Sequence, residues 1–270
     1  MLIGSKEFDF EKKTYVMGIL NVTPDSFSDG NEFYNVDAAL KHAMQMISEG
    51  ADIIDVGGES TRPGYTQISD EEEIERVSPV IEALKKETDV PISLDTYKSE
   101  VAKAGILAGA DLINDIWGLK YDENIARVIA DNNKACCIMH NRDNTDYADF
   151  EQDVLNDLAE SIRIAKKYGI SDDKIILDPG VGFAKDTEQN LKAIALISNM
   201  RHMGYPVLLG VSRKTVIGNV LGIANKKERL YGTIALDLEG MKLGARILRV
   251  HDVKAHVDAV KMTEALLEYC

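Results

Sequence analysis

Short apolar runs alternate with longer amphipathic segments along this chain, and the alternation is completed eight times in 270 residues. Each apolar run is about as long as a β-strand and is continuous, with no regular exchange of apolar and polar residues. Continuous runs of this kind are typical of strands that are buried on both faces, as in a parallel sheet. The predicted strands are residues 15–22, 52–57, 90–95, 111–116, 135–140, 174–178, 205–212 and 246–251.

The segments between these runs carry apolar residues at helical spacing. The segment 70–89, for example, begins with acidic residues and ends with Lys85 and Lys86, an order that complements the helix dipole. The predicted helices are residues 36–50, 70–89, 98–110, 123–133, 150–169, 186–204, 226–245 and 252–269.

Eight strands that are each followed by a helix predict a (β/α)8 TIM barrel. A doubly wound open sheet is the structural alternative, but eight βα units argue against it. No Pro/Gly-rich linker or low-complexity tract divides the chain, so we expect a single domain over residues 1–270. Residues 1–13 precede the first strand and are predicted to form a short N-terminal extension, in which a hairpin can close the bottom of the barrel.

The charge balance limits the partners of the protein. With 31 basic and 45 acidic residues the formal net charge is −14, which argues against nucleic acid or an anionic membrane as the main partner. No apolar run approaches the ~18 residues of a membrane span. The three cysteines form no disulfide framework or CxxC pattern, and the charged N-terminus lacks the apolar centre of a secretory signal, so we expect a cytoplasmic protein.

Every predicted strand carries a polar or charged side chain at or close to its carboxyl end. In a (β/α)8 barrel these strand ends converge on one face, which holds the active site. For any single residue a polar loop is an adequate explanation, but the whole set together indicates a site. The strand-end residues are Asn21, Asp55, Asp95, Asn114, Asp115, His140, Asp178, Ser212, Arg213, Lys214, Arg249 and His251.

Specific motifs lie at these strand ends. They are GILNVTPDSFSDG (18–30), GGESTRPG (57–64), ISLDT (92–96), INDI (113–116), LDPGVGFAK (177–185), GVSRK (210–214) and RVHDV (249–253). In this order the sequence resembles the dihydropteroate synthase family. The resemblance covers about residues 15–261 and implies a transferase of folate biosynthesis. Such an enzyme joins 6-hydroxymethyl-7,8-dihydropterin diphosphate to 4-aminobenzoate, and its products are 7,8-dihydropteroate and pyrophosphate.

The pterin is expected to bind at the strand ends. A pterin edge presents an amine and a ring N–H side by side, and Asp178 can accept both as a bidentate pair. Asn114 offers a donor and an acceptor to the neighbouring edge. Asp95 can accept a ring N–H, Lys214 can donate to a ring carbonyl or nitrogen, and Met139 can pack against the ring face. Local sequence leaves other roles open: a cap or turn for Asp178, a strand-end turn for Asn114 and ordinary core for Met139.

The diphosphate requires cations and hydrogen-bond donors. Arg249 and His251 lie two residues apart on the last predicted strand, so their side chains are expected to share a face, in the region where this fold commonly binds phosphate. The alternatives are an ion pair between Arg249 and a nearby acid such as Asp252, and a structural role for His251. The resemblance places Asn21 against the diphosphate and its Mg2+, which should be held largely by phosphate oxygens and water.

The resemblance also implies the course of the reaction. Departure of pyrophosphate can run ahead of attack by the amine, which is an SN1-like path, and Mg2+, Arg249 and His251 would neutralise the leaving group. Asp95 and Asp29 are predicted to stabilise the pterinylmethyl cation, and Lys214 is predicted to assist. No covalent nucleophile is required.

The 4-aminobenzoate is expected to contact the second loop at Thr61, Arg62 and Pro63, which match family positions. Phe183 can form a wall against its ring, and the hydroxyl of Thr215 can meet its carboxylate. The first two long loops are expected to close over the substrates. Arylsulfonamides, which mimic 4-aminobenzoate, should therefore compete with it.

Two alternative functions are less consistent with the sequence, and a quaternary structure is predicted. A methyltetrahydrofolate-dependent methyltransferase would share the pterin residues but has no use for a diphosphate site. A non-catalytic pterin-binding barrel would be expected to have lost Lys214 or Arg249, and neither is lost. Outer helices near residues 234–245 are expected to form a homodimer. The role of His140 is left open.

Overall fold

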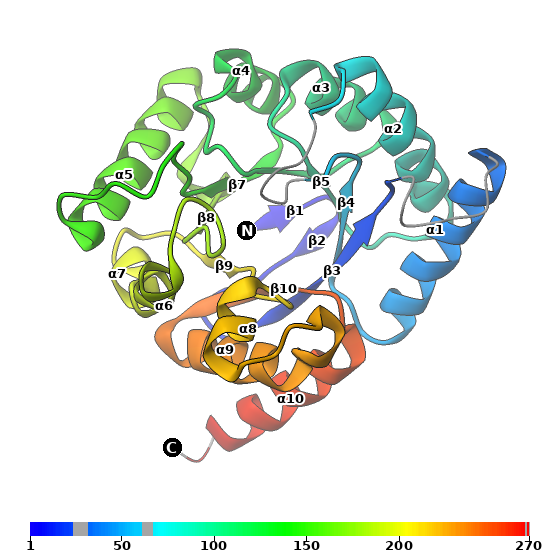
Figure 1. Cartoon of the computed structure of the whole chain (residues 1–270). Helices are drawn as coiled ribbons and strands as arrows, with labels where there is room; N and C mark the ends of the chain where they lie inside the picture. The colour runs from blue at the N-terminus through cyan, green and yellow to red at the C-terminus, as the bar shows by residue number, and fades with distance from the viewer. Residues whose placement is uncertain (24–31, 61–66, 268, 270) are drawn as a thin grey trace.

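The computed structural model describes residues 1–23, 32–60, 67–267 and 269, and within these ranges eight parallel strands close into a barrel (Figure 1). The strands follow one another around the barrel in chain order, and the last pairs with the first. This confirms the predicted (β/α)8 barrel. The strands are β3 (Tyr15–Asn21), β4 (Ile53–Gly57), β5 (Ile92–Asp95), β6 (Leu112–Asp115), β7 (Ala135–Met139), β8 (Ile175–Asp178), β9 (Val207–Leu209) and β10 (Ala245–Val250).

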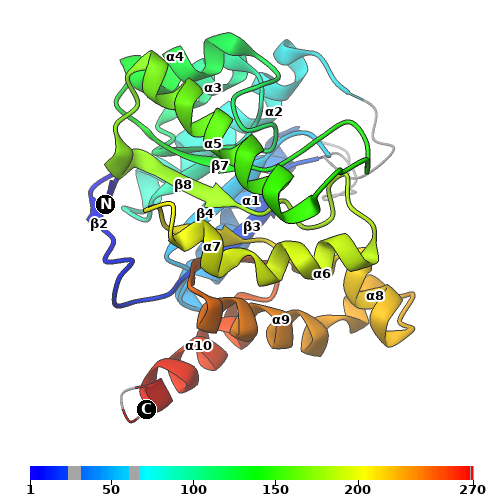
Figure 2. The same ribbon diagram turned by 90° about the vertical axis from the view of Figure 1, so that its left-hand side faces the viewer.

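Helices form an outer ring around the strands (Figures 1 and 2). They are α1 (Glu32–Ser48), α2 (Asp70–Glu87), α3 (Ser99–Ala108), α4 (Glu123–Asp131), α5 (Phe150–Tyr168), α6 (Thr187–Ala195), α7 (Ile197–Arg201), α8 (Thr215–Leu221), α9 (Leu230–Leu243) and α10 (Val253–Leu267). Two short 3-10 helices, η2 (Asp172–Lys174) and η3 (Lys226–Glu228), lie between them. None of the helices in the described part of the chain combines the length and the apolarity that crossing a membrane requires.

Local signals account for several helix ends. The side chain of Ser69 accepts a hydrogen bond from the backbone N–H of Glu72 and caps the start of α2. Asp149 caps α5 in the same way, and α5 ends at Gly169, whose φ of 95° is a left-handed conformation that favours glycine. These caps lie close to the boundaries that the sequence predicts.

The structure differs from the predicted helices in three places. The single helix expected over residues 186–204 is α6 followed by α7, with the break at Leu196. Leu196 lies between the two helices with φ −72° and ψ −5°, and Ile194, Leu196 and Ile197 are all buried. The helix expected from residue 226 begins only at Leu230, after η3. Helix α8 was not predicted, because only seven residues separate the strand loop from Gly222.

The N-terminal extension closes one end of the barrel, as predicted. Strands β1 (Leu2–Ile3) and β2 (Lys6–Glu7) form an antiparallel hairpin, at the end from which the barrel strands start (Figure 2). Ile3, Phe8 and Phe10 are buried against residues near the beginnings of the barrel strands, such as Met17 and Leu112. This cluster fills the bottom of the barrel and leaves the opposite end to the strand-end polar groups.

Phe8→Ala is expected to lower the free energy of unfolding by about 3 kcal/mol, because it removes a buried aromatic ring and leaves a cavity. The Phe8 ring packs edge-on to Tyr15, with centroids 4.7 Å apart, and only 3% of the residue is exposed. Urea unfolding will measure the loss. Turnover at 25 °C should be unchanged, since the ring is at the opposite end from the site; a parallel fall in turnover would contradict this separation.

Candidate active site

The strand register aligns several of the predicted residues in one row. Asn21 on β3 pairs with Gly57 on β4, Gly57 pairs with Asp95 on β5, and Asp95 pairs with Asn114 on β6. Gly57 has no side chain between those of its neighbours. A Cβ there would be in van der Waals contact with both of them, 3.7 Å from Oδ1 of Asn21 and 3.7 Å from Cβ of Asp95. Three polar side chains at the carboxyl ends of their strands therefore lie at the same height around the barrel mouth.

A pocket at this mouth brings together seven of the ten predicted site residues that the structure describes. Its walls come from five of the barrel strands and from the loops that follow them. The lining residues are Asp95, Asn114, Ile116, Met139, Asp178, Phe183, Gly210, Lys214 and Arg249. Gly210 lies between two of the charged groups, since a Cβ there would be 3.9 Å from both Cδ of Arg249 and Oδ2 of Asp178. The pocket thus combines two carboxylates, an amide and two cations around an apolar wall.

Arg249 is held by two carboxylates from across the barrel. Its Nε donates to Oδ2 of Asp55 at 2.6 Å, and its Nη2 donates to Oδ2 of Asp95 at 2.7 Å. Arg249 therefore forms ion pairs with acids, as the alternative interpretation expected. Asp252 is not one of them, because it makes two hydrogen bonds to the guanidinium of Arg213, at 3.0 and 2.6 Å. Because β10 pairs with β3 and β3 pairs with β4, closure of the barrel places Asp55 of β4 within hydrogen-bonding distance of Arg249.

The charges around Arg249 shift the pKa values of its partners. Burial raises the pKa of Asp95 to about 7; the charge of Arg249 opposes this rise, and the charge of Asp55 adds to it. Burial disfavours the charged guanidinium, but Asp55 and Asp95 outweigh this effect and hold the pKa of Arg249 above its usual value. The Arg249 guanidinium therefore forms ion pairs with both Asp55 and Asp95. Oδ1 of Asp95 has no hydrogen-bond partner among the described residues, so it can accept from a ligand.

Asp178 and Lys214 form the opposite side of the pocket. Oδ1 of Asp178 accepts a hydrogen bond from the backbone N–H of Gly180 at 2.7 Å. Burial raises the pKa of Asp178, although the charge of Lys214 opposes the shift. The Lys214 ammonium donates to the carbonyl of Val181 and lies 4.8 Å from the centroid of the Phe183 ring. Burial lowers the pKa of Lys214 to about 8, and Asp178 counteracts part of that shift.

Other predicted residues lie outside the pocket lining. His251 lies one residue beyond the end of β10, so the expectation that it shares the strand with Arg249 is wrong; its Nδ1 is 2.9 Å from Oγ of Ser212. Thr215 is exposed at the first position of α8. Asp29, Thr61, Arg62 and Pro63 lie outside the residues that the structure describes, and their roles remain predictions.

Asp55 is a site residue to which the sequence analysis assigned no role. It is fully buried on β4, where Oδ2 accepts from Arg249 and, at 3.3 Å, from Nδ2 of Asn114. Asp55 therefore holds one diphosphate candidate and one pterin candidate in place. The signal was a carboxylate inside an otherwise apolar run, IIDVG, because a buried charge requires a partner.

Comparison with known proteins agrees with this geometry. The model of the family described as "Pterin binding enzyme" matches residues 17–251. A dihydropteroate synthase of Clostridium beijerinckii is 55% identical over 268 residues, 99% of both chains. The crystal structure of a Clostridium difficile dihydropteroate synthase in the presence of pteroic acid has a TM-score of 0.94 at 50% identity, over 96% of this chain and 99% of the other. The structure of a Xanthomonas albilineans dihydropteroate synthase with 4-aminobenzoic acid has a TM-score of 0.91 at 42% identity, over 94% of this chain and 93% of the other.

Proposed function

The chain belongs to the dihydropteroate synthase family of pterin-binding enzymes, and we propose on that premise how its residues divide the family's reaction. The enzyme is a transferase that condenses 6-hydroxymethyl-7,8-dihydropterin diphosphate with 4-aminobenzoate to give 7,8-dihydropteroate and pyrophosphate. The methyltransferase and the non-catalytic barrel that the sequence left as alternatives gain no support from these relatives. The observation that carries the assignment of roles is the pocket in which Asp95, Asn114 and Asp178 face Lys214 and Arg249.

The pterin ring is assigned to the apolar wall of that pocket. Asp178 accepts from the exocyclic amine and the adjacent ring N–H, and Asn114 pairs with the neighbouring edge. Oδ1 of Asp95, which has no partner among the described residues, accepts a further ring N–H. Lys214 donates to a ring carbonyl or nitrogen. Met139, which is 4% exposed in the lining, packs against the ring face.

The diphosphate is assigned to Asn21, Arg249 and His251. Nε and Nη2 of Arg249 hold Asp55 and Asp95, and we assign Nη1 to a phosphate oxygen. Asn21 offers one amide oxygen, and among the described residues no group of three or more His, Cys, Asp or Glu is arranged to hold a metal ion. That donor set fits Mg2+ held mainly by substrate phosphates and water. When bound, the ion supplies positive charge to the leaving pyrophosphate.

The pocket suits a dissociative displacement. The C–O bond to pyrophosphate breaks first and its electron pair leaves with the phosphate, after which the arylamine forms the C–N bond and loses a proton. Arg249 and His251 offset the charge on the leaving group. The Asp95 carboxylate, with Asp29 from the first loop, stabilises the pterinylmethyl cation, and Lys214 holds the ring in place.

The 4-aminobenzoate is assigned to the outer side of the pocket. Phe183 supports this role, because its ring lies in the lining beside Lys214. Thr215 follows Lys214 directly and is exposed, so its hydroxyl is accessible to a carboxylate. We also assign Thr61, Arg62 and Pro63 to the binding of 4-aminobenzoate, and only their match to the family motif supports this role.

We also propose a homodimer and a cytoplasmic location. Large apolar side chains are exposed on neighbouring outer helices: Leu221 on α8 is 52% exposed and Tyr231 on α9 is 84% exposed. This surface, close to the predicted interface, supports self-association. Two cysteines, Cys136 and Cys137, are free and buried in β7, which suits a reducing compartment.

Purified protein with Mg2+ is expected to release pyrophosphate at a substantial rate only when both substrates are present, with slow ionisation of the pterin diphosphate alone as background. Pyrophosphate release and dihydropteroate formation should be measured together and should agree one to one. An arylsulfonamide should raise the apparent KM for 4-aminobenzoate. Absence of release with both substrates would overturn the assignment.

A further inference from the structure

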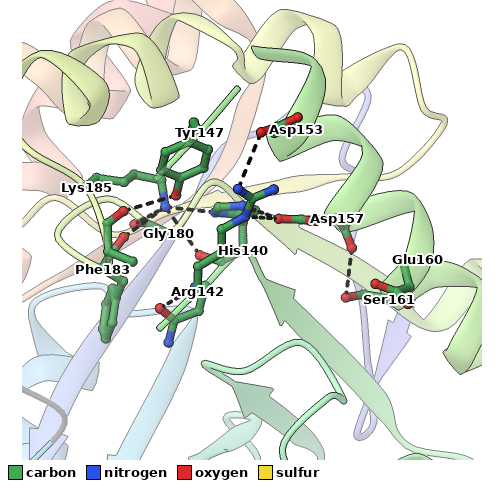
Figure 3. Close-up of polar contacts among 12 residues, drawn as sticks. His140, Arg142, Tyr147, Asp153, Asp157, Glu160, Ser161, Gly180, Phe183 and Lys185 are labelled. Carbon is green, nitrogen blue, oxygen red and sulfur yellow. Dashed lines mark hydrogen bonds and ion pairs between the residues drawn. The ribbon is translucent and has the colours of Figure 1, made fainter. Parts of the chain in front are cut away.

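Lys185 is a buried lysine that does not line the pocket. It ends the motif LDPGVGFAK, it is 9% exposed, and its side chain turns back into its own loop (Figure 3). The Nζ atom donates to the carbonyl of Gly180 at 3.0 Å and to the carbonyl of Phe183 at 3.0 Å, and it lies 2.8 Å from Nδ1 of His140. These contacts tie the loop after β8 to the end of β7.

The contacts define the charge and the tautomer in this cluster. A lysine ammonium has three N–H groups, and the three short contacts supply three acceptors if Nδ1 of His140 carries no proton. The proton of the imidazole is then on Nε2, which donates to Oδ2 of Asp157 at 3.0 Å. Burial and the charge of Lys185 lower the pKa of His140 to about 3, which agrees with a neutral ring. Burial also lowers the pKa of Lys185 to about 7, and the charge of Asp178 opposes that shift.

Helix α5 holds the other end of this chain of contacts. Oδ2 of Asp157 also accepts from Nε of Arg142 at 2.6 Å. The guanidinium of Arg142 lies 4.5 Å from the centroid of the Tyr147 ring, and the hydroxyl of Tyr147 donates to the carbonyl of Ala184 at 3.0 Å. The loop is therefore held at Ala184 and at Lys185 by the segment that follows β7.

The same loop positions the proposed pterin residues. Its Gly180 N–H binds Oδ1 of Asp178, and its Val181 carbonyl accepts from Lys214. The fit against His140 is close, since a Cβ on Gly180 would lie 1.8 Å from the His140 carbonyl oxygen. A shift of this loop would therefore move the hydrogen bonds of both Asp178 and Lys214.

We propose that Lys185, held by His140 and by the carbonyls of Gly180 and Phe183, is a positioning residue that fixes the loop over residues 180–185 and thereby the orientation of Asp178 and Lys214 toward the pterin. This inference rests on the proposed pterin site. Lys185 also places a positive charge near Asp178, which faces Lys214 and Arg249 as well, and all three cations favour the ionised carboxylate.

Lys185→Met tests the proposal, because it keeps most of the side-chain volume and removes the donors and the charge. The dissociation constant for 6-hydroxymethylpterin, measured by titration calorimetry on the full-length enzyme, is expected to rise at least tenfold. The loss of a cation should also raise the pKa of Asp178, so affinity should begin to fall at a higher pH than in the wild type as the solution is acidified. Lys192→Met, which alters an exposed lysine of α6, is the matched control and should change neither quantity.

A pair of His140 variants keeps the test decisive if Lys185→Met does not fold. His140→Asn places an amide oxygen close to the position of Nδ1 and preserves an acceptor for Lys185, whereas His140→Leu removes it. We expect affinity near that of the wild type in the first and a loss of at least tenfold in the second. Wild-type affinity and an unchanged pH midpoint in Lys185→Met, or equal affinity in the two His140 variants, would overturn the proposal. Failure of the wild type to bind the pterin would instead overturn the pterin site.

Discussion

Asp178→Ala will weaken the binding of a pterin by about a hundredfold or more, because hydrogen bonds to a charged group are each worth about 1.5–3 kcal/mol and two are lost together. Asp178 is buried at the end of β8 and faces the pocket beside Lys214. Its removal also leaves the backbone N–H of Gly180 without its acceptor. Titration calorimetry with 6-hydroxymethylpterin will measure the change.

The barrel should remain folded in this variant. Asp178 carries a raised pKa because of its burial, which means that the folded state does not favour its charge, so removing the carboxylate should not greatly lower stability. Asp173→Ala, in the exposed 3-10 turn η2, is a suitable control for loss of an aspartate. Normal pterin affinity in Asp178→Ala, with circular dichroism like that of the wild type, would remove Asp178 from the site.

Arg249→Met is expected to lower the free energy of unfolding by about 4 kcal/mol at pH 8 and to reduce turnover by about a hundredfold or more. The first effect arises because Asp55 and Asp95 would both stay buried without their shared cation. The second arises because charge on the departing pyrophosphate would lose its main protein partner. Urea unfolding and pyrophosphate release will measure the two effects.

The stability loss should depend on pH in a defined direction. Without the guanidinium, Asp95 would bind a proton still more readily in the folded state than in the unfolded state, because the charge of Arg249 now opposes its protonation. The pKa of Asp95 is already raised to about 7 with Arg249 present, so stability of the variant should rise as the pH is lowered from 8 to 5.5. Adding Asp55→Asn to Arg249→Met should recover part of the stability and none of the turnover. Equal destabilisation at both pH values, with no recovery in the double variant, would contradict this account.

The fold could be predicted from the sequence because its main signals are local. Apolar runs, helical spacing and the polar ends of strands are all readable within about ten residues, and together they identify the barrel and the face that carries Asp95, Asn114 and Asp178. The break at Leu196 could not be predicted, since no Gly or Pro marks it and the buried Ile194 and Ile197 have the spacing of one continuous helix.

The partners of the site residues could not be predicted as well as the residues themselves. Asp252 is three positions from Arg249 in sequence, yet Arg249 binds Asp55, which is 194 positions away. That pairing depends on closure of the sheet, and closure brings together strands from opposite ends of the chain. The contacts of Lys185 could not be predicted for a similar reason: they depend on how the loop after β8 lies against the end of β7, and nothing in the local sequence indicates that the side chain turns inward.

The N-terminal hairpin and its aromatic residues give the barrel a floor that is separate from its mouth. The first residues of the strands pack in the apolar cluster with the hairpin, and the last residues of the strands line the pocket. Heat resistance and substrate recognition are therefore adjustable through different sets of side chains. Selection or engineering can strengthen the floor around Phe8 and Phe10 while the chemistry at the mouth stays as it is.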